Sequence, residues 1–308
     1  MATKKKEILF DFPNPMDNNF LVGHRDTLKA FMNAWADHEK HPIHPVWMLC
    51  GPRGIGKATL AYKIAKQVYG NVGDFFILDL AHNLDEHGNT KPDAKAISVH
   101  TVRNMIEKMQ MSSMSGQWRV VLIDAADELT EAAENAILKL LEEPPQKTLF
   151  LLVTHQLSKV LPTVRSRARV EKMHPLTTSE LRELCVRFMP DTEISSEILK
   201  LSNGSFGKIA NLKATGGDAI YDELLSVLQN KHSTASDMMR LAEKIAESPA
   251  LYGIVLDAIA YLNLADIYPA ANQAISDITR LNLKPDVTIF RIINEIKNVY
   301  RYSLSFNR

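Results

Sequence analysis

The 308-residue chain contains only two cysteines, Cys50 and Cys185. Two thiols are too few for a four-thiolate zinc site or a disulfide scaffold, and such scarcity is typical of a reducing compartment. The chain also lacks any apolar run near the roughly 18 residues that a membrane-spanning helix needs. Its start has no apolar segment long enough for a signal peptide. We therefore expect a cytoplasmic protein with no membrane partner.

The chain has no excess of charge of either sign, because its 36 lysines and arginines balance its 36 aspartates and glutamates. This balance excludes a uniformly basic surface for nucleic acid and an acidic disordered tail. Any contact with DNA therefore has to come from a local patch, and we expect the isolated chain to bind DNA weakly. The length allows about two or three domains, each with a core of its own.

Between residue 44 and about residue 175, short apolar runs alternate with amphipathic stretches. Continuous apolar runs of this length are typical of strands buried on both faces, whereas apolar residues three and four apart indicate helices. The predicted strands are 44–50, 75–80, 119–123, 148–154 and 169–173, and the predicted helices are 57–69, 98–111 and 130–143. Ser98 and Thr130 begin two of these stretches as N-caps. The alternation predicts an α/β fold, with a parallel sheet covered by helices on both faces.

After about residue 175 the pattern is helical throughout. Asparagine, glycine and proline pairs interrupt it at 203–204, 216–217, 248–249 and 284–285, and such residues end or separate helices. We therefore predict three domains: an α/β domain at 1–175, a small helical domain at 176–215 and a C-terminal helical domain at 216–308.

A glycine-rich turn follows the first predicted strand and opens the next helix. Its sequence, GPRGIGK at 51–57, has the G-x-x-x-x-G-K spacing of a phosphate-binding loop. In such a loop the glycines let backbone N–H groups face an anion, the helix N-terminus adds partial positive charge, and the lysine reaches the terminal phosphates. The candidate nucleotide-binding residues here are Gly51, Arg53, Gly54, Gly56 and Lys57. An ordinary glycine turn is the alternative.

The residue after the lysine is Ala58. A working phosphate-binding loop has Ser or Thr there, because that hydroxyl binds Mg²⁺. Thr59 comes next, but one step along a helix turns a side chain by about 100°, away from the metal. We expect that ATP or ADP binds weakly through the backbone and Lys57, with Thr59 nearby, and that Mg²⁺ is poorly held.

A second nucleotide element is expected where the apolar run 120–123 ends in Asp124. A carboxylate at the carboxyl end of a buried strand is where an ATPase of this kind holds Mg²⁺. Such an ATPase also needs a base that orients the attacking water, usually a glutamate directly after the aspartate. Here that residue is Ala125, so we expect little or no intrinsic ATP hydrolysis. A plain turn residue is the alternative role of Asp124.

Three stretches carry a family resemblance: LVGH at 21–24, LIDAADELTEAAENAILKLLEEPP at 122–145 and LPTVRSR at 161–167. Together they resemble the delta-prime subunits of bacterial DNA polymerase III clamp loaders, which are AAA+ proteins. The resemblance covers about residues 20 to 210. It implies an AAA+ α/β domain, a small helical lid and a C-terminal helical collar.

The resemblance also implies a function and partners. Such a chain would sit in a five-membered ring with motor and clamp-opening subunits. The ring opens a sliding clamp and places it on primed DNA, and the delta-prime member is a relatively rigid subunit without motor activity. The chain would thus be part of a DNA polymerase holoenzyme.

Arg167 is the catalytic candidate that the resemblance implies. Family members carry an arginine in a Ser-Arg-Cys motif that reaches the ATP site of the neighbouring subunit. Here the motif is Ser166-Arg167-Ala168, in which a small residue replaces the cysteine. The alternative is that Arg165, Arg167 and Arg169 form a solvated basic edge.

Thr154 is the candidate sensor of the γ-phosphate. It ends the predicted strand 148–154, where AAA+ proteins place a polar sensor residue. A hydroxyl that caps the following turn is the alternative.

We expect no zinc, although related subunits often hold a four-cysteine zinc module. The corresponding segment, 70–97, contains no cysteine. His82 and His87 lie there without a third well-placed ligand, and such a polar loop is more often solvated.

The start of the predicted helix at Ser98 is a candidate DNA contact. Helix starts that face the ring interior bind template phosphates in related loaders. Ser98, Thr101 and Arg103 could do so through hydroxyl, backbone N–H and guanidinium groups. A plain N-cap with an exposed arginine is the alternative.

Two functional hypotheses remain. The first is a non-motor clamp-loader subunit that donates Arg167 to a neighbour. The second is an active P-loop ATPase, such as the loader's motor or a related DNA-remodelling protein, and it rests on the complete G-x-x-x-x-G-K. Ala125 argues against the second hypothesis, and a small-molecule kinase is a distant third.

Overall fold

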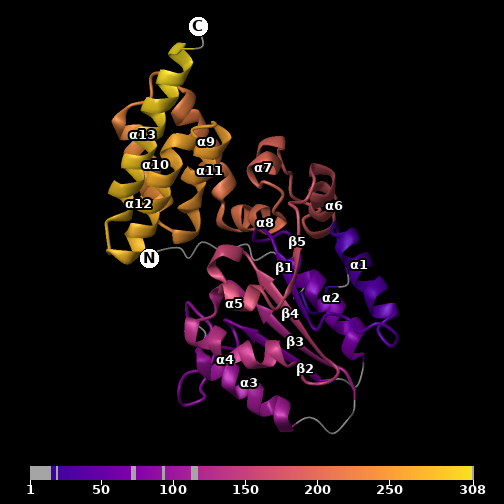
Figure 1. The fold of residues 1–308 in the computed structure, drawn as a ribbon. Helices are drawn as coiled ribbons and strands as arrows, with labels where there is room; N and C mark the ends of the chain where they lie inside the picture. Colours follow the sequence, from indigo (N-terminus) through magenta and orange to yellow (C-terminus); the bar gives the residue numbers. More distant parts are fainter. Residues whose placement is uncertain (1–14, 19, 71–73, 92–93, 112–116, 307–308) are drawn as a thin grey trace. The chain divides into compact units, whose positions relative to one another are not determined.

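The computed structural model describes residues 15–18, 20–70, 74–91, 94–111 and 117–306. The chain divides into two compact units (Figure 1). The first runs from residue 12 to 190 and includes 204–206, and the second contains 191–203 and the residues from 207 onward. Each unit is described by itself below.

A five-stranded parallel sheet forms the centre of the first unit (Figure 1). The strand order is β2-β3-β4-β1-β5, and every neighbouring pair is parallel. The strands are β1 Val46–Cys50, β2 Asp74–Asp79, β3 Arg119–Asp124, β4 Thr148–Thr154 and β5 Arg169–Lys172. All five lie where the apolar runs predicted them, and the parallel sheet is confirmed.

Helices cover both faces of this sheet. Side chains alternate between the faces of a strand, so Trp47 and Leu49 of β1 pack on one side and Val46 and Met48 on the other. The first side is covered by α1 Arg25–Ala36 and α2 Lys57–Tyr69, and the second by α3 Val99–Met111 and α4 Glu131–Glu142. The prediction of a sheet covered on both faces is therefore confirmed.

The helix ends in this unit have the caps that the sequence predicts. The Ser98 hydroxyl accepts a hydrogen bond from the Thr101 N–H at 3.2 Å, and the Thr130 hydroxyl accepts one from Ala133 N–H at 3.2 Å. A cap of this kind contributes about 1 kcal/mol. The remaining helices of the unit are η1 Ala126–Glu128, η2 Leu157–Lys159, α5 Pro162–Arg165 and α6 Thr178–Phe188.

The second unit is helical among its described residues, as predicted. Its core is one cluster of leucine, isoleucine, valine, alanine and aromatic side chains, in which α10 and α13 pack closely. The helices are α7 Ser196–Leu201, α8 Phe206–Thr215, α9 Gly217–Gln229, α10 Ala235–Ala246, η3 Pro249–Leu251, α11 Gly253–Tyr261, η4 Ala265–Ile267, α12 Tyr268–Arg280 and α13 Pro285–Phe306. The predicted breaks lie between helices, since Gly216 has φ 67° and Pro249 and Pro285 begin new helices.

The predicted division into three domains remains a prediction. The two compact units separate near residue 190, so α6 belongs with the sheet and α7 with the C-terminal helices. Within the described part of the chain, no helix is both long enough and apolar enough to cross a membrane.

Candidate functional site

The predicted phosphate-binding loop joins β1 to α2, and its glycines are required by the backbone. Gly54 has φ 78° and Gly56 has φ 100°, which are left-handed values that glycine adopts at little cost. A Cβ on Gly51 would lie 2.6 Å from the Met173 carbonyl oxygen. Sequence and geometry therefore agree on a tightly built loop between strand and helix.

Lys57 is bound by the loop itself. Its side chain is buried, with 3% exposed, and its Nζ donates to the carbonyl oxygens of Gly51 at 2.8 Å and Pro52 at 2.6 Å. Burial lowers the pKa of this ammonium to about 8, although Asp124 and Asp127 nearby favour the charged form. The lysine that would reach a terminal phosphate thus donates its hydrogen bonds to two carbonyl oxygens of its own loop.

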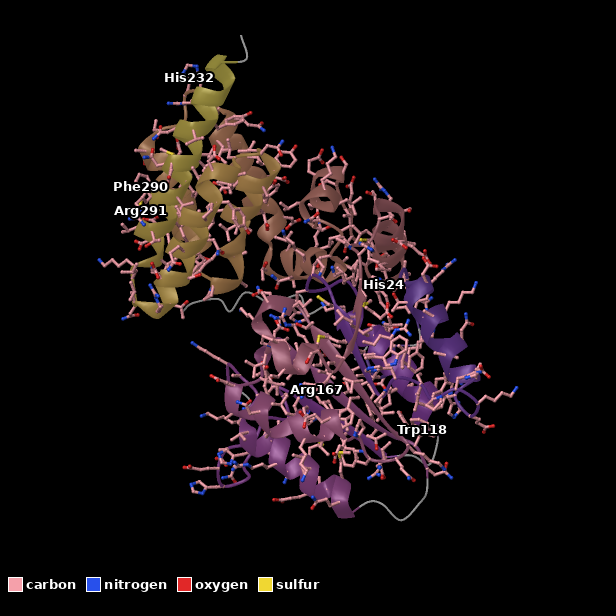
Figure 2. All side chains as sticks on the ribbon, viewed as in Figure 1. His24, Trp118, Arg167, His232, Phe290 and Arg291 are labelled. Carbon is pink, nitrogen blue, oxygen red and sulfur yellow. The ribbon has the colours of Figure 1, made fainter. Side chains whose placement is uncertain are left out.

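Two more loop carbonyls are bound by side chains that the sequence analysis did not assign. The His24 Nε2 lies 2.7 Å from the Ile55 carbonyl oxygen, and the Ser205 hydroxyl donates to the Arg53 carbonyl at 2.8 Å. Burial lowers the pKa of His24, so its neutral ring donates this hydrogen bond. His24 lies at the start of α1 (Figure 2). Its position in the LVGH stretch was the available signal.

The N–H side of the loop is the part suited to an anion. Among the described residues, the backbone N–H groups of residues 53–57 have no hydrogen-bond acceptor, whereas four of the loop's carbonyls are bound by side chains. Consecutive N–H groups at a helix N-terminus form a cradle for phosphate. The residues present therefore fit the phosphate groups of a nucleotide.

The same residues do not fit Mg²⁺. Ala58 has no side-chain oxygen, and Thr59 lies half-buried one position further along α2. Asp124 ends β3 opposite Asp79 of β2, and burial together with Asp79 and Glu128 raises the pKa of Asp124 to about 6. A carboxyl group that holds its proton up to pH 6, beside a lysine and without a hydroxyl partner, is a poor ligand for a hard cation.

Thr154 and Asp127 meet at the carboxyl end of β4. The buried Thr154 hydroxyl donates to Asp127 Oδ1 at 3.0 Å, and the same carboxylate accepts the backbone N–H groups of His155 at 2.8 Å and Gln156 at 3.2 Å. Asp127 thus caps the end of the strand with Thr154 as one of its donors, and a role of Thr154 as a phosphate sensor remains a prediction. Glu128 forms an ion pair at 2.8 Å with the exposed Arg53.

His155 is a further residue of this region that the sequence analysis missed. Burial, with Lys57 and Arg53 nearby, lowers the pKa of His155 to about 4, so its ring is neutral. Its buried Nδ1 has no partner among the described residues. A histidine after the strand-ending threonine was the only signal in the sequence.

Arg167 lies between α5 and β5, well apart from His24 (Figure 2). Its Nη1 donates to the Thr163 carbonyl at 2.7 Å, and its Nη2 donates to Glu142 at the end of α4. The side chain is 31% exposed and lines a cavity of about 530 Å³, together with Glu142, Ser166, His44, Pro45, Leu141 and Pro144. The guanidinium is therefore held in place and open to solvent.

The two candidate elements lie at opposite ends of the sheet. The phosphate-binding loop follows the carboxyl end of β1, whereas Arg167 precedes β5, which pairs in parallel with β1 through Trp47 and Arg169. A five-residue strand such as β1 is about 16 Å long at about 3.3 Å per residue. The structure brings the loop residues, Asp124 and Thr154 together and keeps Arg167 away from them.

The candidate DNA contacts are mostly bound within the chain. Thr101 is buried and its hydroxyl donates to Asn83 Oδ1 at 2.7 Å, while the Ser98 hydroxyl donates to the Leu84 carbonyl at 2.6 Å. Both side chains hold the loop before α3 onto the helix start. Only Arg103 exposes its side chain, and contact with DNA remains a prediction.

His82 and His87, the two histidines in the segment where related subunits hold zinc, contact different acidic side chains. His82 Nδ1 is 2.8 Å from Asp79, and His87 Nε2 is 3.6 Å from Glu86. Within the part of the chain that the structure describes, no group of three histidine, cysteine or acidic side chains could hold a metal ion.

Comparisons with known proteins agree with the family resemblance. A family model described as DNA polymerase III, delta subunit, matches residues 23–177, half of the chain. The DNA polymerase III subunit delta' of Pseudomonas aeruginosa is 35% identical over 173 residues, which cover 52% of this chain and 52% of that protein. The DNA polymerase III subunit gamma of Buchnera aphidicola is 27% identical over 225 residues, which cover 64% of this chain and 58% of that protein.

A solved structure of a DNA polymerase III gamma subunit-related protein from Thermotoga maritima is 16% identical, with a TM-score of 0.47, and the match covers 88% of this chain and 99% of that one. The chain spans somewhat more than half the length of the two curated relatives. On the strength of the family model, which extends from before α1 to the end of β5 and beyond it, the chain belongs to the DNA polymerase III delta subunit family.

Proposed function

We propose that this chain is a clamp-loader subunit of a DNA polymerase III holoenzyme. It is an AAA+ subunit without motor activity that assembles with motor and clamp-opening subunits, and through them acts on the sliding clamp and on primed DNA. In the assembled ring it donates Arg167 to the ATP site of a neighbouring subunit. Membership of the family and the similarity to delta' and gamma subunits support the assembly.

The placement of Arg167 carries the proposal that it acts in trans. It lies at the amino end of the sheet, about the length of β1 away from the loop that follows the carboxyl end of that strand. An arginine side chain cannot span that distance within a folded domain. The triphosphate that Arg167 would contact must therefore belong to another chain.

The chain's own site supports nucleotide binding without hydrolysis. The free N–H groups of residues 53–57 can bind phosphates of ATP or ADP, but Lys57 already has two carbonyl partners, so we expect weak binding. No carboxylate follows Asp124 to orient water, because Ala125 is buried and apolar. Asp127 is fully engaged at the end of β4.

The role of Arg167 is electrostatic. Charge develops on the γ-phosphate oxygens as the phosphoryl group is transferred, and a fixed guanidinium stabilises that charge. An arginine supplied by a neighbouring chain contributes about 10³ to 10⁵ in rate in comparable enzymes. The chain would thus couple assembly of the ring to turnover in the next subunit.

Reconstitution of the ring tests this function. The chain is combined with the other loader subunits of the same organism, and ATP turnover is measured in the presence of clamp and primed DNA. Arg167→Ala should remove the turnover of the one site it serves, whereas Arg169→Ala, whose guanidinium stacks on Trp47 and pairs with Glu171, should leave it unchanged. Equal rates for wild type and Arg167→Ala would refute the role in trans.

A second measurement separates this function from that of a motor ATPase. The purified chain alone should show negligible ATP turnover. Turnover by the lone chain that disappears in Lys57→Ala would refute the non-motor assignment, and failure to enter a complex with loader subunits would refute the assembly.

A further inference from the structure

Three groups of the same chain contact the guanidinium of Arg167. The Thr163 carbonyl binds Nη1 at 2.7 Å, the Ser166 hydroxyl lies 3.4 Å from the same nitrogen, and Glu142 binds Nη2. Arginine has five N–H donors, and these contacts use three of them. The Nε–H and one hydrogen of Nη2 therefore remain without an acceptor among the described residues.

The place of Glu142 is not explained by the stability of its helix. It is the last residue of α4, and Glu143 and then Pro144 follow it. Carboxylates are unfavourable at a helix C-terminus, where the macrodipole is negative. Glu143, directly beside it, has no contact with Arg167 among the hydrogen bonds and ion pairs of the described residues. The pairing with Arg167 is thus the specific feature of Glu142.

Glu142 and Arg167 also share one cavity. Both line the open space of about 530 Å³, and so does Ser166, which lies between α5 and β5. This is the space from which a partner's phosphate could reach the two remaining N–H donors. A flexible arginine would enter it in many rotamers, and ordering such a side chain costs conformational entropy.

We propose that Glu142 is the positioning residue of Arg167: with the Thr163 carbonyl it fixes the guanidinium in the cavity, so that Nε–H and the remaining Nη2 hydrogen are presented to the incoming triphosphate. The inference rests on the proposed function. Glu142 stays paired while the phosphate binds, because the guanidinium has donors for both. It acts on the rate through the orientation of Arg167, since misplacement of a catalytic group by about 1 Å can slow a reaction about 100-fold.

The test measures the Arg167-dependent turnover, defined as the difference in kcat between the wild-type ring and the Arg167→Ala ring. Glu142→Ala should lower this quantity by about three- to tenfold, with KM for ATP within about twofold of wild type. Glu142→Gln keeps an acceptor oxygen and should retain at least about half of it. Glu143→Ala removes the neighbouring carboxylate and should have no effect. Gel filtration confirms that each variant enters the ring.

Two further observations complete the test: the turnover of the Glu142→Ala, Arg167→Ala double variant, and whether Glu142→Ala lowers or raises turnover. In the Arg167→Ala background, Glu142→Ala should cause no further loss, because its effect passes through the arginine. Unchanged turnover in Glu142→Ala would overturn the inference, and so would increased turnover, which would mean that Glu142 competes with phosphate. If Arg167→Ala itself has no effect, the proposed function fails, whereas an effect of Arg167→Ala without one of Glu142→Ala refutes only the positioning role.

Discussion

The two ends of the sheet hold their charged side chains in opposite ways. At the carboxyl end, Lys57 is buried and Asp124 is half-buried near it, and burial shifts their pKa values to about 8 and about 6. At the amino end, Arg167 and Glu142 form a pair in which each side chain is partly exposed, at 31% and 47%. The Lys57 ammonium is shielded from water and bound by its own loop. Among the described residues, the Arg167 guanidinium keeps two N–H donors for a new acceptor while it stays paired with Glu142.

This difference matches the two proposed roles: the loop binds a nucleotide without hydrolysing it, and Arg167 acts on the ATP site of a neighbouring subunit. A group that must meet another chain's phosphate has to be accessible, and an exposed pair of charges contributes little to stability, about 0–1 kcal/mol. Buried charges depend strongly on their surroundings, because desolvation and unpaired polar groups are costly there. We therefore expect substitutions at the carboxyl end to change stability and those at the amino end to change the activity of the ring.

The largest effect on stability is expected for Gly51→Ala. The new Cβ would lie 2.6 Å from the Met173 carbonyl oxygen and 3.0 Å from Ile55 Cδ1. The first contact is with backbone that pairs with β1, because the Met173 N–H donates to the Cys50 carbonyl. The steric clash can therefore be removed only by a shift of the strand end. We expect a loss of about 3 kcal/mol in the free energy of unfolding, measured by urea denaturation.

Gly88→Ala is the control for that substitution. Gly88 has φ 80°, but no atom lies within 4 Å of the position that an added Cβ would take. Only the left-handed backbone is therefore strained by the new side chain, at about 1 kcal/mol. A loss at Gly51 no larger than that at Gly88 would show that the loop yields easily and would weaken the contrast between the two ends.

The next effect is the pH dependence that Lys57 produces. Its pKa falls from 10.5 to about 8 on folding, so between these values the unfolded chain binds more protons. Stability from this group therefore rises as the pH increases from about 8 toward 10.5. Lys57→Met lacks the ionisation, and the stability of wild type relative to Lys57→Met should rise by about 3 kcal/mol across that window. A constant difference between pH 7 and pH 10.5 would contradict a buried, desolvated ammonium.

Asp124 should give a smaller effect of opposite direction. Its pKa rises from 3.8 to about 6 on folding, so the folded chain binds more protons in that range. The stability contributed by the protonated form is complete below about pH 4 and is lost as the pH rises through 6. Asp124→Asn should therefore be more stable than wild type by about 3 kcal/mol at pH 8, slightly less than the Lys57 effect, with no advantage at pH 4. A destabilised Asn variant at pH 8 would show that Asp124 is stabilised by its cationic neighbours rather than strained by burial.

The local patterns of the sequence predicted the fold well. The helix 57–69 and the strand 148–154 have the predicted bounds, because each combines an unbroken hydrophobic pattern with a clear start and stop. The loss of the Mg²⁺-binding hydroxyl at Ala58 and of the water-orienting carboxylate at Ala125 could also be predicted, because each depends only on the position next to Lys57 or Asp124. These features need no knowledge of distant contacts.

The hydrogen bonds of the site could not be predicted in this way. His24 and Ser205 bind loop carbonyls from 31 and 152 residues away, and Asp127 binds Thr154 across 27 residues. Many polar side chains could have filled these roles, so even where a motif such as LVGH marks the residue, the sequence does not identify its partner until the fold brings donor and acceptor together. The pairing of Glu142 with Arg167, 25 residues apart, is of the same kind.

The smallest effect on stability is expected at the amino end of the sheet. Glu142→Ala removes a partly exposed ion pair, which contributes about 0–1 kcal/mol, and also removes a carboxylate from the negative end of α4, which favours the helix by a few tenths of a kcal/mol. The two contributions nearly cancel, so we expect a change within about 0.5 kcal/mol in urea denaturation, with little dependence on salt above about 0.15 M. The same substitution should lower the Arg167-dependent turnover of the ring severalfold. A loss of stability above about 1.5 kcal/mol would mean that the pair supports the fold, and a fall in turnover could then no longer be assigned to the orientation of the arginine.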